Sequence, residues 1–223
     1  MKRKWKLWMI AFVVFVMTDI MMQSNRAEAK KRTFTVSSKT IPCSSSYRQK
    51  PYYNKKTKQY YMINSYMRRL STTGGTLKLK KGTYKIPGTI YVPSNVKIVC
   101  ANGVKIKKTK ATGTKKVKST KFLFQMISEE KASGKQNTGK YAASKNASIQ
   151  GNGKVIFDMG NVNGATAVFV GHASGITVSG VRFRNKKGGS YIWIEGSKNI
   201  SVRQCVFERK KDVSGLKNRM AVR

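Results

Sequence analysis

A 24-residue repeat in the second half of the chain constrains the fold more than any other feature. When residues 168–184 are moved forward by 24 positions, apolar side chains coincide at alternate positions and Gly175 falls on Asn199. Alternating apolar side chains indicate β-strands, and Gly or Asn tolerates the positive φ of a sharp corner. Each copy therefore predicts strand, corner, strand. The matching apolar pairs are Val168 with Ile192, Val170 with Ile194, Ile176 with Ile200, Val178 with Val202, Val181 with Cys205 and Phe183 with Phe207.

The same corner and strand occur twice earlier in the chain. They begin at Asn95 and Asn146, so the four corners are 51, 29 and 24 residues apart. We expect the first spacing to hold two turns of the unit and each of the others one. A unit this short cannot bury its apolar face alone and must stack on its neighbours, which predicts a solenoid. We expect an all-β fold, a right-handed parallel β-helix in which each coil lies on the one before.

The first 29 residues predict a secretory signal peptide. Residues 2–6 are mostly basic, residues 7–17 are apolar but too short to span a bilayer, and Ala27-Glu28-Ala29 is a small-x-small cleavage site. The alternative is an uncleaved membrane anchor, because weak apolar character continues to Met22. Asp19 interrupts that run and favours cleavage before Lys30. We therefore expect a secreted protein, at the exterior or in the wall of a bacterial cell, with membrane contact only through the signal peptide.

The charge of the chain predicts an anionic partner. The formal net charge is +38, and cleavage would remove five basic and two acidic residues, leaving +35. A field of this sign attracts polyanions over a long range. Outside a cell these are acidic polysaccharides and wall polymers, so nucleic acid is not the expected partner. Some lysines, such as Lys78 and Lys97, alternate with apolar strand positions and are expected on the outer face of the coils.

The rest of the chain divides around the repeat. Residues 30–57 are polar and basic and predict an extended lead-in, whereas Tyr60, Ile63, Met67 and Leu70 have helical spacing. We expect that helix to cap the open end of the first coil, at the start of a β-helix domain that spans residues 58–209.

Two polar loops are expected between residues 107 and 144. Residues 210–223 are a short basic tail without a further strand pair, so we expect a C-terminally truncated β-helix.

Several segments carry a resemblance to a known family. The predicted helix is followed by Gly74-Gly75-Thr76, Gly82-Thr83-Tyr84 and residues 90–96, and Ile149-Gln150-Gly151-Asn152-Gly153 occurs later. This order resembles the pectate-lyase-like β-helix superfamily, which includes polygalacturonase-type glycoside hydrolases, over residues 58–208. The resemblance implies the fold and an acidic polysaccharide such as pectin or polygalacturonate. The polygalacturonase segments Asn-Thr-Asp, Asp-Asp, Gly-His-Gly and Arg-Ile-Lys do not occur in the sequence, so fold is implied more strongly than reaction.

The repeat also predicts a candidate site. If Val168 and Ile192 point inward, Phe169 and Trp193 point outward and stack, with Tyr191 and Glu195 on the same face. Aromatic faces pack on the apolar faces of sugar rings, so we interpret Phe169, Trp193 and Tyr191 as a substrate platform. Glu195 is the catalytic acid/base candidate. The alternative is that the long loops cover these aromatic residues and form a second small core with them.

The other acidic residues suggest less chemistry. Glycoside hydrolysis generally uses two carboxyl groups at a set separation. Glu129 and Glu130 fall in a predicted loop, Asp158 at a predicted surface turn, and Glu208 at the repeat position of Arg184, with which an ion pair is expected. His172, the single histidine, lies at a corner and is expected to be structural or exposed. No spacing predicts a metal or cofactor site.

Two classes of function therefore remain open. The leading hypothesis is a secreted carbohydrate-active β-helix protein that binds, and in a complete form cleaves as a hydrolase or lyase, an acidic polysaccharide. The alternative is a non-catalytic module that binds cell-wall polymers, or an inactive fragment of a longer enzyme. Salt discriminates the two, because retention by charge alone collapses at high ionic strength.

Overall fold

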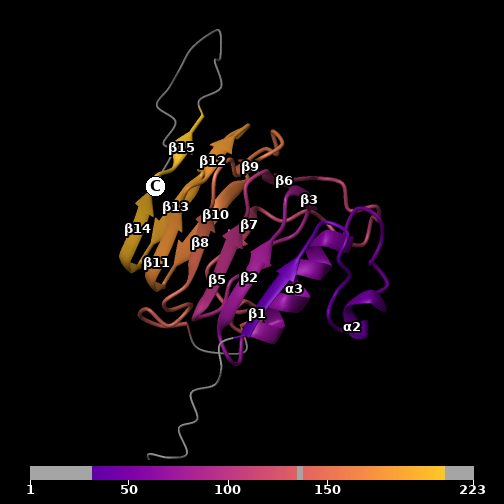
Figure 1. Ribbon diagram of the computed structural model, residues 1–223, viewed down its shortest axis with the longest axis horizontal. Helices are drawn as coiled ribbons and strands as arrows, with labels where there is room; N and C mark the ends of the chain where they lie inside the picture. The colour runs from indigo at the N-terminus through magenta and orange to yellow at the C-terminus, as the bar shows by residue number, and fades with distance from the viewer. Residues whose placement is uncertain (1–31, 135–137, 209–223) are drawn as a thin grey trace, which may run out of the picture. The chain divides into compact units, whose positions relative to one another are not determined.

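Three parallel β-sheets wind around one core in this computed structural model, which describes residues 32–134 and 138–208 (Figure 1). Each coil contributes a strand to each sheet in turn, and every pair of neighbouring strands is parallel. The expected right-handed parallel β-helix is confirmed. The predicted signal peptide and basic tail lie outside the described residues.

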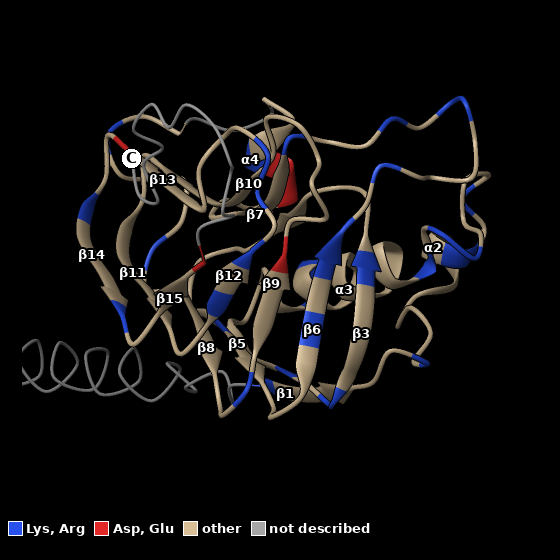
Figure 2. Ribbon diagram, turned by 90° about the horizontal axis from the view of Figure 1, so that it is seen from above, with Lys and Arg blue, Asp and Glu red and all other residues tan. Residues whose placement is uncertain are grey.

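Each sheet is built from strands of successive coils, which lie side by side in the order given below. Sheet A contains β1 (Arg32–Val36), β2 (Gly75–Leu79), β5 (Val96–Cys100), β8 (Ser148–Gly151), β11 (Ser174–Ser179) and β14 (Lys198–Arg203). Sheet B contains β3 (Gly82–Ile86), β6 (Val104–Lys108), β9 (Ile156–Asp158), β12 (Arg182–Arg184) and β15 (Val206–Phe207), several of which lie side by side in Figure 2. Sheet C contains β4 (Ile90–Tyr91), β7 (Phe122–Gln125), β10 (Thr166–Gly171) and β13 (Ile192–Glu195).

The predicted register and corners are confirmed. Val168 lies opposite Ile192 in sheet C, as the 24-residue shift requires. The corner residues just before or at the start of sheet A strands have positive φ, at 60° for Asn95, 53° for Asn146 and 55° for Asn199. Asparagine and glycine are the residues that adopt this left-handed backbone at low cost. The chain therefore turns sharply at each corner and returns to the same sheet.

The expected number of turns between Asn95 and Asn146 was wrong. These 51 residues contain β5, β6 and β7, which make up a single coil. The surplus residues leave the coil after β6 and after β7, where the long connections run over residues 109–121 and 126–147. The second of these connections includes a short helix, α4 (Glu129–Ala132). Spacing alone could not distinguish an added coil from added loops.

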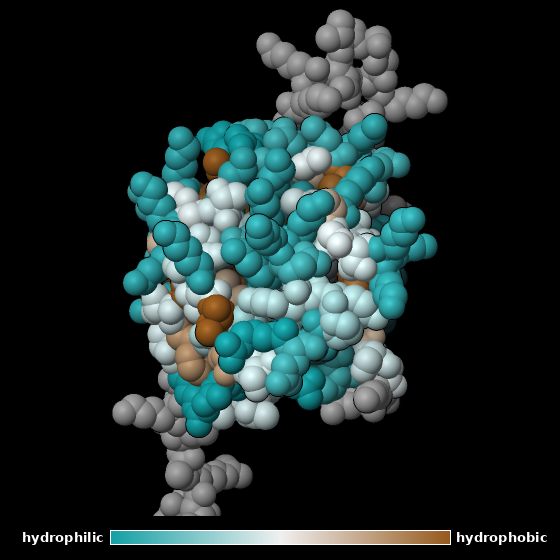
Figure 3. Space-filling view, turned by 90° about the vertical axis from the view of Figure 1, so that its right-hand side faces the viewer, coloured by the Kyte–Doolittle hydropathy of each residue, from teal (hydrophilic) through white to brown (hydrophobic). Residues whose placement is uncertain are grey.

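The predicted capping helix is α3 (Lys58–Leu70), which packs against β2, β3 and β4. Met62, Ile63, Met67 and Leu70 are buried and continue the solenoid core into the helix. Gly88 lies against the ring of Tyr60, where a Cβ atom would overlap the ring. The outer surface at this end is largely hydrophilic (Figure 3). Within residues 32–134 and 138–208, no helix is long and apolar enough to cross a membrane.

The predicted lead-in also contributes regular structure. β1 pairs with β2, so sheet A begins one strand before the capped coil, and α2 (Ser45–Arg48) packs on α3. Val36 is buried, and the rings of Phe34 and Tyr66 are 5.2 Å apart. β1 and α3 thus close the first coil together.

Asp158 is not the surface turn residue that the sequence predicted. It ends β9, is 3% exposed, and its Oδ2 lies 3.1 Å from Lys105 Nζ and 3.4 Å from Arg184 Nη2. Burial alone would raise its pKa, but a 2.9 Å hydrogen bond donated by Asn185 Nδ2 and the contact with Lys105 outweigh burial and lower the pKa. Asp158 is therefore a carboxylate that joins the outer faces of three neighbouring coils.

The expected ion pair between Arg184 and Glu208 does not form, because each residue pairs with a different partner. Glu208 Oε1 lies 3.0 Å from Arg182 Nη1, while Arg184 is engaged by Asp158. A buried carboxylate loses more hydration than an exposed one, so it gains more from a neighbouring guanidinium.

Lys108 is a buried lysine at the end of β6. Its Nζ donates to the carbonyl oxygens of Gly88 at 3.0 Å, Pro87 at 2.9 Å and Phe122 at 2.9 Å, and to Thr120 Oγ1 at 3.2 Å. Burial lowers the pKa of Lys108 to about 7, whereas the ring of oxygen acceptors favours the ammonium form. The side chain ties the start of β7 to the corner between sheets B and C.

We expect Lys108→Met to lower the free energy of unfolding by about 2 kcal/mol, because methionine fits the space but removes the donor of the buried Gly88 carbonyl oxygen. Chemical denaturation followed by circular dichroism measures this change. Lys110→Met, at an exposed position on the same segment, is the control and should change the value by less than about 0.5 kcal/mol. Equal stability of the two variants would contradict the structural role of Lys108.

Candidate functional site

One row of outward side chains crosses all the strands of sheet C. Tyr91 of β4 lies opposite Gln125 of β7, which lies opposite Phe169 of β10 and then Trp193 of β13. Each step is about 4.8 Å, so the row is about 14 Å long. Its side chains are half-buried, whereas the adjacent Val168 is fully buried. We call these four residues the sheet C row.

The row contains the predicted aromatic pair. The ring centres of Phe169 and Trp193 are 5.4 Å apart and the rings meet edge to face at 72°. Phe122, which the sequence analysis missed, stacks on Phe169 at 4.6 Å and 10°. Lys121 Nζ lies 4.8 Å from the ring centre of Trp193. The predicted pair is therefore adjacent on the outer face of sheet C, and Phe122 of β7 covers part of it.

Tyr191 does not belong to this face. It is 2% exposed, and its hydroxyl donates to the carbonyl oxygen of Glu208 at 2.7 Å. Its ring packs at 5.7 Å from that of Phe183 and 6.0 Å from that of Phe207. Tyr191 precedes β13, so the alternation that would direct it outward has not yet begun. It is a core residue at the corner before the strand.

Glu195 lies at the carboxyl end of β13, opposite Gly171, and is exposed. The other acidic residues in the described part of the chain each form an ion pair within 4.0 Å, and Glu195 forms none there. The exposed His172 follows β10 and donates its backbone N–H to the Glu195 carbonyl oxygen at 3.0 Å. A Cβ at Gly196 would come within 3.0 Å of the His172 ring. A carboxylate and an imidazole thus lie at one end of the row.

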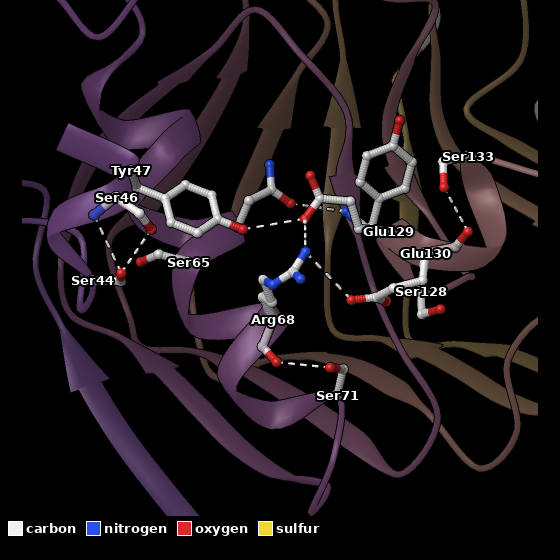
Figure 4. Close-up of polar contacts among 12 residues, drawn as sticks. Ser44, Ser46, Tyr47, Ser65, Arg68, Ser71, Ser128, Glu129, Glu130 and Ser133 are labelled. Carbon is white, nitrogen blue, oxygen red and sulfur yellow. Dashed lines mark hydrogen bonds and ion pairs between the residues drawn. The ribbon is translucent and has the colours of Figure 1, made fainter. Parts of the chain in front are cut away.

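Glu129 and Glu130 lie in α4 rather than in a loop. Arg68 Nη1 lies 3.7 Å from Glu129 Oε2 and 3.5 Å from Glu130 Oε1, and Tyr47 donates its hydroxyl to Glu129 at 3.1 Å (Figure 4). These contacts hold α4 to α3 and α2. The two carboxylates are therefore partly exposed and contact Arg68, next to the capping helix.

Acidic residues lie on α4, at the end of β9, at the end of β13 and just past β15, and basic residues are far more numerous (Figure 2). Among residues 32–134 and 138–208, no three His, Cys, Asp or Glu side chains come together as metal ligands. The row and its neighbours offer the rings of Phe169 and Trp193, the Lys121 cation and, at the end of β13, the Glu195 carboxylate.

Comparisons with known proteins add little. No protein-family model matches the chain, and no curated protein matches it either. The similar solved structures include an iota-carrageenase complexed to iota-carrageenan fragments and an iota-carrageenase from A. fortis in the absence of chloride ions. Each is 21% identical with a TM-score of 0.41, and the match covers 66% of this chain but 36% of theirs. At this identity the likeness concerns the fold alone.

We expect Phe122→Ala to move the fluorescence emission of Trp193 to longer wavelength, because the Phe122 ring packs against Trp193 at 6.3 Å and shields it from water. The other tryptophans are Trp5 and Trp8, so a difference spectrum against Trp193→Phe isolates the signal. Phe34→Ala, at an aromatic position in β1, is the control. An unchanged emission maximum in Phe122→Ala would mean that Phe122 does not shield the platform.

Proposed function

We propose that this protein is a carbohydrate-active β-helix that binds an acidic polysaccharide across the outer face of sheet C. The observation that carries the proposal is the outward pair of Phe169 and Trp193, held one coil apart at a 5.4 Å ring separation. Because the two residues come from adjacent coils, their exposed edges and faces can contact successive sugar rings of one polymer. Lys121, whose Nζ lies 4.8 Å from the Trp193 ring centre, supplies a cation that can pair with a carboxylate of the polymer.

The charge of the chain supports an acidic ligand over a neutral one. The formal net charge is +38, and the acidic side chains of the described residues are largely engaged with the protein's own basic groups. A polyanion is therefore attracted from a distance, and the aromatic rings then provide short-range contacts. The resemblance of residues 58–208 to the pectate-lyase-like superfamily supports polygalacturonate as the first ligand to test. The predicted signal peptide supports secretion, where such polymers occur.

We expect Trp193→Ala to weaken binding of polygalacturonate about tenfold, because a lost stacking contact is worth about 1 kcal/mol or more. Calorimetric titration at low and high salt measures this loss. Stacking should survive at high salt, whereas the contribution of charge should fall. Tyr141→Ala, which removes an exposed aromatic ring outside the row, is the control. Equal binding by Trp193→Ala and wild type at both salt concentrations would mean that stacking on Trp193 does not contribute and that the protein binds wall polymers through its charge.

Cleavage is a second candidate, favoured by Glu195. This carboxylate is exposed at the end of the row, two positions beyond Trp193 on the same strand face. Without an ion pair inside the described residues, it is available to exchange a proton with a bound sugar. Glu129 follows β7 of the same sheet, but it lies in α4 and contacts Arg68 and Tyr47 beside the capping helix. Glu195 is therefore the residue on which an acid/base role rests.

If the protein cleaves polygalacturonate, Glu195→Gln should lower the rate at least about a hundredfold, because the amide cannot transfer the proton. Reducing-sugar release and the ultraviolet absorbance of unsaturated products, with and without calcium, distinguish hydrolysis from lysis. Glu208→Gln, in a surface ion pair with Arg182, is the matched control and should leave the rate within about twofold, since exposed ion pairs contribute little. A well-folded wild type that releases no product is a binding protein.

A further inference from the structure

A second candidate site lies beside the capping helix. A cavity of about 320 Å³ opens between α2, α3 and the start of α4. None of its lining residues belongs to the sheet C row. We call it the tyrosine pocket. The lining residues that matter here are Tyr47, Lys50, Tyr52, Tyr60, Tyr61 and Glu129.

The tyrosine rings are inclined to one another. The ring centres of Tyr60 and Tyr61 are 4.9 Å apart at 57°, and those of Tyr47 and Tyr61 are 6.4 Å apart at 62°. Tyr47 and Tyr61 are 6% and 7% exposed, so their positions are set by packing rather than by solvent. Inclined aromatic faces around a common space form the kind of cage that attracts an organic cation.

An ammonium group already occupies this cage. Lys50 Nζ lies 5.3 Å from the ring centre of Tyr47 and 5.9 Å from that of Tyr61, within the distance at which cation–π attraction operates. Lys50 is otherwise an exposed side chain on the segment that follows α2. Because its flexible stem reaches in from the surface, it can leave the cage without disturbing the rings.

The pocket also contains a negative charge. The carboxylate of Glu129 lines it, oriented by the Tyr47 hydroxyl at 3.1 Å and by Arg68 Nη1 at 3.7 Å (Figure 4). Burial, together with the neighbouring Glu129, raises the pKa of Tyr47 well above its usual range, so that its hydroxyl stays protonated. The pocket thus combines neutral aromatic faces with one carboxylate, which suits a cation better than a neutral or acidic group.

We propose that the tyrosine pocket binds an organic ammonium group, and that Lys50 occupies the site when this ligand is absent. The ligand chemistry is a primary or quaternary amine of small size, as found in an amino sugar or a choline head group. The cage recognises the cation through the tyrosine faces, and the Glu129 carboxylate, which Arg68 contacts at 3.7 Å, adds an electrostatic contact. Its lining residues differ from those of the sheet C row, so the two proposals are tested separately.

The first experiment titrates the full chain with glucosamine and with choline, using calorimetry. Glucose and N-acetylglucosamine are the uncharged counterparts of glucosamine. The charged probes should bind at least about tenfold more tightly than the uncharged ones, because only they gain cation–π and carboxylate contacts. The two charged probes distinguish a primary from a quaternary amine. Equal affinity for glucosamine and glucose would overturn the proposal.

The second experiment uses variants that spare the buried rings. Lys50→Ala should increase the affinity for the charged probe about fivefold, because the site no longer has to be vacated. Lys55→Ala, at a nearby exposed position, should leave it unchanged. Glu129→Gln should lower it about tenfold.

Unchanged or weaker binding by Lys50→Ala would show that the lysine does not compete with the ligand. Trp193→Ala should bind the charged probes as wild type does. That result separates the tyrosine pocket from the sheet C row, so failure of one proposal does not decide the other.

Discussion

Backbone hydrogen bonding between coils determines almost every other feature of this molecule. Strands of successive coils lie about 4.8 Å apart, so side chains at equivalent positions stack directly on one another. The asparagine corners at Asn95, Asn146 and Asn199 keep this alignment because their left-handed backbone returns the chain to the same sheet. The apolar core, the sheet C row and the acidic contacts on the outer faces all follow from that vertical alignment.

The repeat allowed the register of the later coils to be predicted because stacking imposes the same constraint on each copy. Residues outside the repeat escaped this reasoning. Phe122 lies in a coil whose long loops break the period. Its position depends on long-range contacts, such as the hydrogen bond that Lys108 Nζ donates to the Phe122 carbonyl oxygen. Tyr191 was assigned to the outer face because alternation was extended past the start of β13, where corner geometry directs it inward.

Charged side chains were predictable in position but not in partner. The 24-residue repeat placed Arg184 and Glu208 at equivalent positions of neighbouring coils. The partner of a long charged side chain also depends on how far each candidate carboxylate is buried, and not on distance alone. Asp158 is buried, so it gains more from Arg184 than the half-exposed Glu208 would. Glu195, at the end of the outward aromatic pair, forms no ion pair among the described residues although basic residues far outnumber acidic ones.

The coil between Asn95 and Asn146 holds 51 residues, whereas that between Gly175 and Asn199 holds 24. Both contribute their strands to the same three sheets in register. Doubling a flexible loop costs only about 0.6 kcal/mol of closure entropy, so the solenoid absorbs such insertions where strands end. The connections after β6 and β7 are thus suitable positions for the insertion of new segments. New binding loops can be added there, next to an existing aromatic surface, without redesign of the core.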